Sequence, residues 1–160
     1  MTSATTSEQD TRPTILIVDD TPANVQILAL MFQRLYRIKI ATSGEKCIEI
    51  ANSDPRPDLI LLDINLPDIN GFEVCKTIKQ LDSADNTSII FVSGINSVEE
   101  RITGYEAGGD DYISKPFQLN EFTTKISTVY RYQQTKKNLT KQEVHARNIA
   151  FESMKEASQY

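Results

Sequence analysis

Residues 14–22 read TILIVDDTP, and this stretch decides the fold. Its first five residues are apolar or β-branched without interruption, which is typical of a strand covered on both faces in a parallel sheet. Asp19 and Asp20 end the strand. Thr21 followed by Pro22 is typical of a helix start, because threonine suits the N-cap and proline fits the first helical position. The stretch therefore predicts a strand that passes directly into a helix, with two carboxylates at the junction.

The same unit of strand and helix recurs four times further along the chain. The other predicted strands are Arg37–Ala41, Leu59–Leu62, Ser88–Val92 and Asp111–Ser114. The helix after the second strand is predicted to begin at Ser43 or Gly44, and the helix after the third to cover Phe72–Leu81. The fourth helix is predicted to end at about Ala107, before Gly108 and Gly109, and the fifth to begin near Leu119. Such alternation implies right-handed βαβ units. We therefore expect an α/β fold of the (βα)5 type, with a doubly wound, flavodoxin-like, parallel five-stranded sheet.

Apolar residues at helical spacing support these helices. They lie at Val25, Leu28, Met31 or Phe32, and Leu35 in the first helix, at Val98, Ile102 and Tyr105 in the fourth, and at Leu119, Phe122, Ile126 and Val129 in the last. Cys47 and Cys75 fall in helical patterns without CxxC spacing. We expect both to be buried free thiols rather than metal ligands or a disulfide.

The last helix is predicted to continue beyond the domain as a long C-terminal helical extension. From Leu119 to Tyr160 there is neither glycine nor proline, and a helix of that length would reach roughly 60 Å. Residues 131–160 carry a net charge of +3 and leave −8 on residues 1–130. We expect a disordered tail over 1–12, a domain over 13–131, and a helical extension over 132–160 that serves as a linker toward an output module. The alternatives are a helix that frays past about Lys137 and one that packs against a partner chain.

Composition excludes several classes of partner. The chain has 17 basic and 22 acidic residues, a net charge of −5 and a pI near 4.9, which disfavours direct binding to nucleic acid or to anionic membranes. Residues 1–12 are polar, and no stretch contains 18 successive apolar residues. The sequence thus favours a cytoplasmic protein with no membrane contact.

Polar side chains with chemical potential follow the predicted strands. Asp63, Ser93 and Lys115 each end or follow a strand, as Asp19 and Asp20 do. The carboxyl ends of parallel strands lie along one edge of a sheet, so these side chains are expected to converge on one crevice. Three carboxylates there would repel one another unless a hard cation lay among them, and oxygen ligands favour Mg²⁺.

The same group of residues suits phosphoryl transfer. A carboxylate can attack phosphorus when the charge developing on the phosphoryl oxygens is neutralised by a metal ion and by donors. Asp63 is the candidate nucleophile, with Lys115 and Ser93 as the ammonium and hydroxyl donors.

Four ordered motifs carry a resemblance to a known family. They are VDD at 18–20, LLDINLPDINGFE at 61–73, FVSG at 91–94 and EAGGDDYISKPF at 106–117. Together they resemble the receiver domain of bacterial two-component response regulators, over about residues 13–131. The resemblance implies a signal transduction phosphoprotein that accepts a phosphoryl group on Asp63 from the phosphohistidine of a sensor histidine kinase or phosphotransfer protein.

The resemblance also implies a metal site. Asp19 and Asp20 would hold Mg²⁺ directly or through water, Asp63 would be a ligand, and Asn65 would contribute its backbone carbonyl. The acidic set is complete, which argues against a degenerate receiver. An apolar Ile95, in a position that flanks the phosphoryl site, favours slow autodephosphorylation.

A switch is implied in the same way. Lys115 would pair with the phosphoryl group, Ser93 would donate its hydroxyl to it, and Tyr112 would be the aromatic residue whose ring turns inward. The peptide between Lys115 and Pro116 is expected to be cis. The change would reach the face made by the fourth helix, fifth strand and fifth helix, where an output partner binds or a homodimer forms; the C-terminal helix is a second candidate for dimerisation. Such a protein catalyses only its own aspartyl phosphorylation and dephosphorylation.

Two other classes are weighed against this one. A haloacid-dehalogenase-like phosphatase also uses an aspartyl nucleophile, Mg²⁺ and lysine, but its DxD pattern would here have to be DDT, and there is no insertion long enough for a substrate cap. A flavodoxin-like cofactor binder would need a phosphate loop after the first strand, where this chain has two acids that repel a phosphate.

Overall fold

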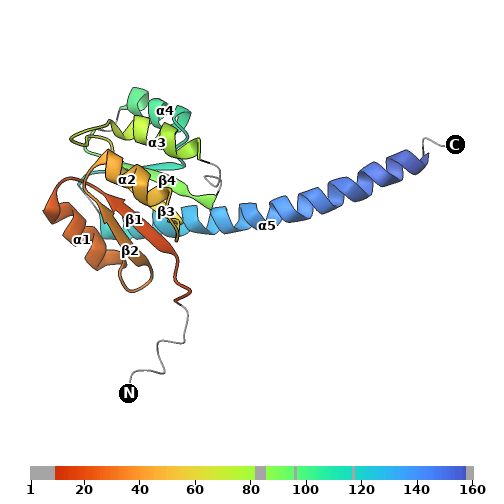
Figure 1. The fold of residues 1–160 in the computed structure, drawn as a ribbon, viewed down its shortest axis with the longest axis horizontal. Coiled ribbons are helices and arrows are strands. Elements are labelled where there is room, and N and C mark those ends of the chain that lie inside the picture. The colour runs from red at the N-terminus through yellow and green to blue at the C-terminus, as the bar shows by residue number, and fades with distance from the viewer. Residues whose placement is uncertain (1–9, 82–85, 96, 117, 158–160) are drawn as a thin grey trace, which may run out of the picture.

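The computed structural model describes residues 10–81, 86–95, 97–116 and 118–157 (Figure 1). The elements in chain order are β1 (Thr14–Val18), α1 (Pro22–Phe32), β2 (Arg37–Ala41), α2 (Gly44–Ala51), β3 (Leu59–Asp63), α3 (Gly71–Lys79), β4 (Ser88–Ser93), α4 (Val98–Glu106), β5 (Asp111–Ser114) and α5 (Leu119–Ala157). All strand pairs are parallel and their order is β2-β1-β3-β4-β5. The predicted (βα)5 doubly wound fold is confirmed. Most of the predicted tail, residues 1–9, lies outside the described residues.

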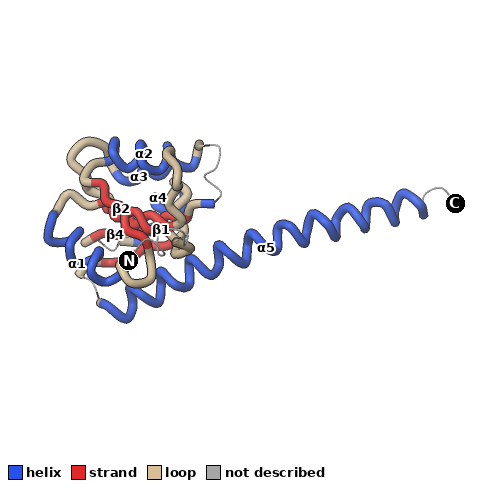
Figure 2. Tube along the Cα trace, turned by 60° about the horizontal axis from the view of Figure 1, so that its bottom comes forward, coloured by secondary structure: helices blue, strands red, loops and turns tan. Residues whose placement is uncertain are grey.

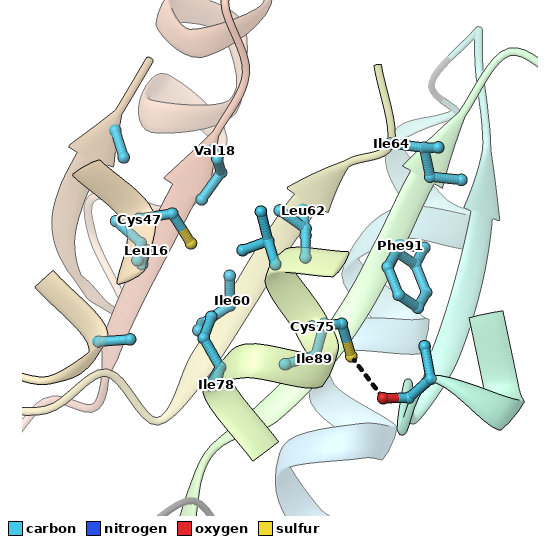
Figure 3. Close-up of a cluster of buried hydrophobic side chains, with 14 of the residues drawn as sticks. Leu16, Val18, Cys47, Ile60, Leu62, Ile64, Cys75, Ile78, Ile89 and Phe91 are labelled. Atoms are coloured by element: carbon cyan, nitrogen blue, oxygen red, sulfur yellow. Dashed lines mark hydrogen bonds between the residues drawn. The ribbon is translucent and has the colours of Figure 1, made fainter. Parts of the chain in front are cut away.

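Helices lie on both faces of the sheet (Figure 2). The hydrophobic core accordingly consists of two layers, one on each face. Alternate residues of β1 point to opposite faces: Leu16 and Val18 join the layer beneath α2 and α3, whereas Ile15 and Ile17 join the layer beneath α1 and α5. This double burial explains why β1 is a continuous apolar run. Figure 3 shows the first layer, in which the Cys75 thiol donates to the Ala107 carbonyl at 3.4 Å.

Both cysteines are buried and free, as predicted. Burial raises the pKa of each thiol, Cys47 and Cys75, to about 12.

Helix α1 is shorter than its apolar pattern predicts. Val25, Leu28 and Phe32 are buried, but the helix ends at Phe32 and Leu35 is 69 % exposed. The chain turns at that point because the Leu35 and Tyr36 amides both donate to the Phe32 carbonyl. At the other end Thr21 occupies the predicted N-cap position, but its side chain makes no capping hydrogen bond.

The apolar side chains whose spacing predicted helix α4 are exposed in the structure. Val98, Ile102 and Tyr105 are between 50 % and 71 % exposed, and only Gly104 of this helix is buried. The helix packs against the sheet through backbone: a Cβ on Gly104 would lie 3.1 Å from Phe91. The helix predicted from the spacing of these residues is therefore present, but their side chains do not face the sheet. The helix ends at Glu106 with Ala107 as its C-cap, and Gly108, with a φ of +106°, occupies the predicted C′ position.

Helix α5 is a single helix of 39 residues that projects far beyond the sheet (Figures 1 and 2). Phe122, Ile126 and Val129 are buried, whereas Leu119 is exposed, contrary to the predicted stripe. Gln133 ties the helix to the domain, because its side-chain amide nitrogen donates to the carbonyls of Asp58 and Asn86 at 3.1 and 2.6 Å. The predicted extension beyond the domain is confirmed. No helix among the described residues is long and apolar enough to span a membrane.

Candidate functional site

The carboxyl ends of four strands bring the candidate residues to one edge of the sheet. Asp63 ends β3 and pairs in register with Val92, next to Ser93 at the end of β4. Ser93 is in register with Ser114, next to Lys115, and the Lys115 amide donates to the Ser93 carbonyl at 2.7 Å. The peptide that follows, between Lys115 and Pro116, is cis, as expected.

The Lys115 ammonium lies between two buried carboxylates. Its Nζ is 3.3 Å from Asp19 Oδ2 and 3.5 Å from Asp63 Oδ2. Burial raises the pKa of the Asp63 carboxyl above its ordinary value; the Lys115 charge lowers this pKa and the Asp19 charge raises it further. The lysine thus keeps two neighbouring acids together that would otherwise repel each other.

Asp19, Asp20 and Asp63 offer carboxylate oxygens that all lie within 4.8 Å of one another. Asp19 and Asp63 are buried and Asp20 is exposed. Hard oxygen donors at this spacing fit Mg²⁺, with the exposed acid on the side open to water. Asn65 lies two residues after Asp63, and its amide donates to Asp63 Oδ1 at 3.3 Å.

Local hydrogen bonds position Asp19 and the loop that follows Asp63. Asp19 Oδ1 accepts the Thr21 amide at 2.9 Å, and Oδ2 accepts the Asn24 side chain at 3.2 Å. Sequence reasoning missed Asn24, although it lies one helical turn beyond the acidic pair. In the loop after β3, the Gly71 amide donates to the Ile64 carbonyl at 2.8 Å, so the loop folds back onto the end of the strand.

Ser93 and Tyr112 lie on the α4 side of the site. The Ser93 hydroxyl donates to Glu100 Oε2 at 3.4 Å and accepts the Ile95 amide at 3.1 Å. The buried Tyr112 hydroxyl reaches the Ile95 carbonyl at 2.8 Å and also the Glu100 carboxylate. Burial first, and then the hydrogen bond to Glu100, raises the pKa of Tyr112 to about 12.

The predicted residues therefore divide into two groups. Asp19, Asp63 and Lys115 are in direct contact, whereas the Ser93 hydroxyl has no hydrogen bond to Asp63 among the described residues and contacts α4 instead. Glu100 was not singled out from the sequence; the pattern SVEE at 97–100 matches a helix capping box and gives no signal of a contact with Ser93.

A family of known proteins matches most of this chain. The model of the response regulator receiver domain matches residues 15–127. A protein of Vibrio cholerae named "Probable cyclic di-GMP phosphodiesterase" is 36 % identical over 129 residues, which are 81 % of this chain and 29 % of that protein. The DNA-binding dual master transcriptional regulator RpaA of Synechocystis is 30 % identical over 120 residues, 74 % of this chain and 49 % of that protein.

Solved structures agree with these matches. The crystal structure of a CheY-like response regulator receiver domain protein from Methanospirillum hungatei has a TM-score of 0.72 at 28 % identity, and the match covers 79 % of this chain and 99 % of that one. The chain spans half or less of the length of the two relatives named above.

Proposed function

Because this chain belongs to the response regulator receiver domain family, we propose that Asp63 is its phosphoacceptor and that phosphorylation there switches its contacts with other proteins. The observation that carries the assignment is the Lys115 ammonium, which lies within 3.5 Å of the Asp63 carboxylate at the sheet edge. Proteins of this family act as switches in two-component signalling.

The proposed reaction needs little beyond positioning and charge. A carboxylate oxygen of Asp63 forms a bond to phosphorus while the bond from phosphorus to the imidazole nitrogen of the donor phosphohistidine breaks. Lys115 places positive charge beside the incoming phosphoryl oxygens, and the Ser93 hydroxyl donates to one of them after leaving Glu100. Asp19, Asp20, Asp63 and the Asn65 carbonyl would hold Mg²⁺, which when bound neutralises further charge on the phosphoryl group.

We propose that the protein catalyses only the phosphorylation and dephosphorylation of its own Asp63. The phosphoryl donor would be a sensor kinase or phosphotransfer protein in the cytoplasm. The phosphatase alternative is not retained, because the matching family model over 15–127 is that of a receiver. The two relatives named above extend well beyond the matched part, and their names refer to a cyclic di-GMP phosphodiesterase and a DNA-binding transcriptional regulator. We propose that α5 leads toward an output of such a kind.

The exposed apolar residues of α4 support a contact face for the partner. Val98 and Ile102 on α4, together with Leu119 at the start of α5, are each at least half exposed. We propose that this face, between α4 and α5, binds the output or a second copy of the chain; the projecting part of α5 is the alternative site of dimerisation.

The decisive experiment is a mass measurement after incubation with acetyl phosphate and Mg²⁺. A gain of about 80 Da, one phosphoryl group, is expected for the wild type and for Asp54→Asn, whose side chain is 96 % exposed. The gain should be lost in Asp63→Asn and after removal of Mg²⁺. A gain that persists in Asp63→Asn, or no gain in the wild type from either acetyl phosphate or a phosphorylated kinase, would contradict the assignment.

A further inference from the structure

The Glu100 side chain could cap helix α4 or could hold Ser93 and Tyr112, and capping is the simpler role. It lies three residues after Ser97, the N-cap of α4, and SVEE matches the capping box, in which the glutamate side chain reaches back to the N-cap amide. Half of the box is present, because the Ser97 hydroxyl accepts the Glu100 amide at 3.1 Å. The described hydrogen bonds of the Glu100 carboxylate, however, come from Ser93 and Tyr112. Capping alone does not explain this orientation.

The hydrogen bond from Ser93 to Glu100 matters because the Ser93 hydroxyl can donate only once. A serine hydroxyl has one proton to donate. In this structure it is directed at Glu100 Oε2, while the hydroxyl oxygen accepts the Ile95 amide. A Ser93 hydroxyl that donates to a phosphoryl group on Asp63 therefore has to give up Glu100. The carboxylate and the phosphoryl group compete for the same proton.

Tyr112 keeps the Glu100 carboxylate in place for this competition. The tyrosine is 3 % exposed, and its hydroxyl contacts both Glu100 and the Ile95 carbonyl. The Arg101 guanidinium lies 5.9 Å from the centre of its ring. A carboxylate held by a buried phenol is a better-placed acceptor than a freely rotating surface glutamate.

We infer that Glu100 is a positioning residue of the switch: its carboxylate accepts the hydroxyls of Ser93 and Tyr112 in this structure and has to release Ser93 when Asp63 carries a phosphoryl group. This inference rests on the proposed function of Asp63. The inference adds a residue, Glu100, that opposes the phosphorylated state. Glu100 lies on α4, the helix whose apolar side chains are exposed.

The test is the affinity of the full-length chain for beryllofluoride, a phosphoryl mimic, measured by calorimetry in the presence of Mg²⁺. Glu100→Ala removes the competing acceptor and is expected to bind at least about fivefold more tightly than the wild type, the lower range for a coupling between two sites. Glu100→Gln keeps an oxygen acceptor without the charge, so its affinity should fall between the two. The matched control is Glu99→Ala, an exposed acid in the same helical turn, which should bind within about twofold of the wild type.

A double-mutant cycle separates competition for Ser93 from a general effect on α4. In a Ser93→Ala background there is no proton to compete for, so Glu100→Ala should change the affinity by less than about twofold. Equal or weaker binding by Glu100→Ala, or an undiminished gain in the Ser93→Ala background, would overturn the inference. If Glu100→Ala does not fold, the test rests on Glu100→Gln. A beryllofluoride affinity of Glu100→Gln equal to that of the wild type would then contradict the inference. A folded wild type that binds no more beryllofluoride than Asp63→Asn would instead remove the proposed function, and the inference with it.

Discussion

Gly71 offers the sharpest test of how the site is built. A Cβ added at this position would lie 2.5 Å from the Asp63 carbonyl oxygen and 2.7 Å from Ile64 Cα. Both neighbours are backbone atoms at the end of a buried strand, so neither can move aside as a flexible side chain would. Gly71→Ala must therefore displace either α3 or the end of β3, together with the hydrogen bond from the Gly71 amide to the Ile64 carbonyl.

The expected cost follows from that displacement. Overpacking that shifts backbone costs typically about 1–3 kcal/mol, and the present case lies at the upper end because both clashing atoms are backbone. We expect the free energy of unfolding to fall by about 2–3 kcal/mol and the melting temperature by roughly 5–10 °C. Phosphorylation by acetyl phosphate should slow as well, because Asp63 is the residue whose carbonyl is displaced.

Urea denaturation of the wild type, Gly71→Ala and Gly94→Ala measures the effect. Gly94 is the matched control: it follows β4 at the same edge of the sheet, and a Cβ there would meet no atom within 4 Å. Its substitution should leave the free energy of unfolding unchanged or raise it by up to about 1 kcal/mol. If Gly71→Ala were within about 0.5 kcal/mol of the wild type, the close approach of α3 to the end of β3 would be refuted.

Three further predictions concern charge and burial. Lys115→Met should raise the pKa of Asp63 further, because the ammonium lowers it, and carboxyl NMR of labelled aspartate would measure this. The pKa of Asp63 is raised in the folded state, so its ionisation destabilises the fold as the pH rises through that pKa; Asp63→Asn should accordingly raise the melting temperature at pH 7 more than at pH 3. A smaller gain at pH 7 than at pH 3 would contradict the sign. Gln133→Ala removes the amide donor shared by the carbonyls of Asp58 and Asn86 and should cost about 1–3 kcal/mol in urea unfolding, whereas Gln134→Ala should cost under about 0.5 kcal/mol.

The sequence predicted the strands and the sheet-edge cluster because both depend on local pattern. A run such as TILIV is typical of a strand buried on both faces in a parallel sheet, and residues at the carboxyl ends of such strands converge whatever their separation along the chain. The position of Lys115 beside Asp19, 96 residues away, follows from that rule alone.

The contacts of α4 could not be predicted in the same way. Apolar spacing indicates a helix but does not say which face meets the sheet, and here the small Gly104 lets the backbone approach Phe91 while the larger side chains face outward. The role of Glu100 was hidden for a related reason. Its hydrogen bonds to Ser93 and Tyr112 depend on the rotation of α4 about its axis, which the local pattern SVEE does not indicate.

The charge balance of the site opposes the stability of the fold. Asp19, Asp20 and Asp63 gather three negative charges, and Lys115 is the one described ammonium in ion-pair contact with them. Burial and the neighbouring Asp19 make ionised Asp63 a net cost to the fold. An uncharged residue at that strand end would be cheaper, and sequences break such local rules mainly where function requires it. The excess negative charge instead suits a site that receives a divalent cation, and the raised pKa of Asp63 fits the phosphoacceptor role that we propose for it.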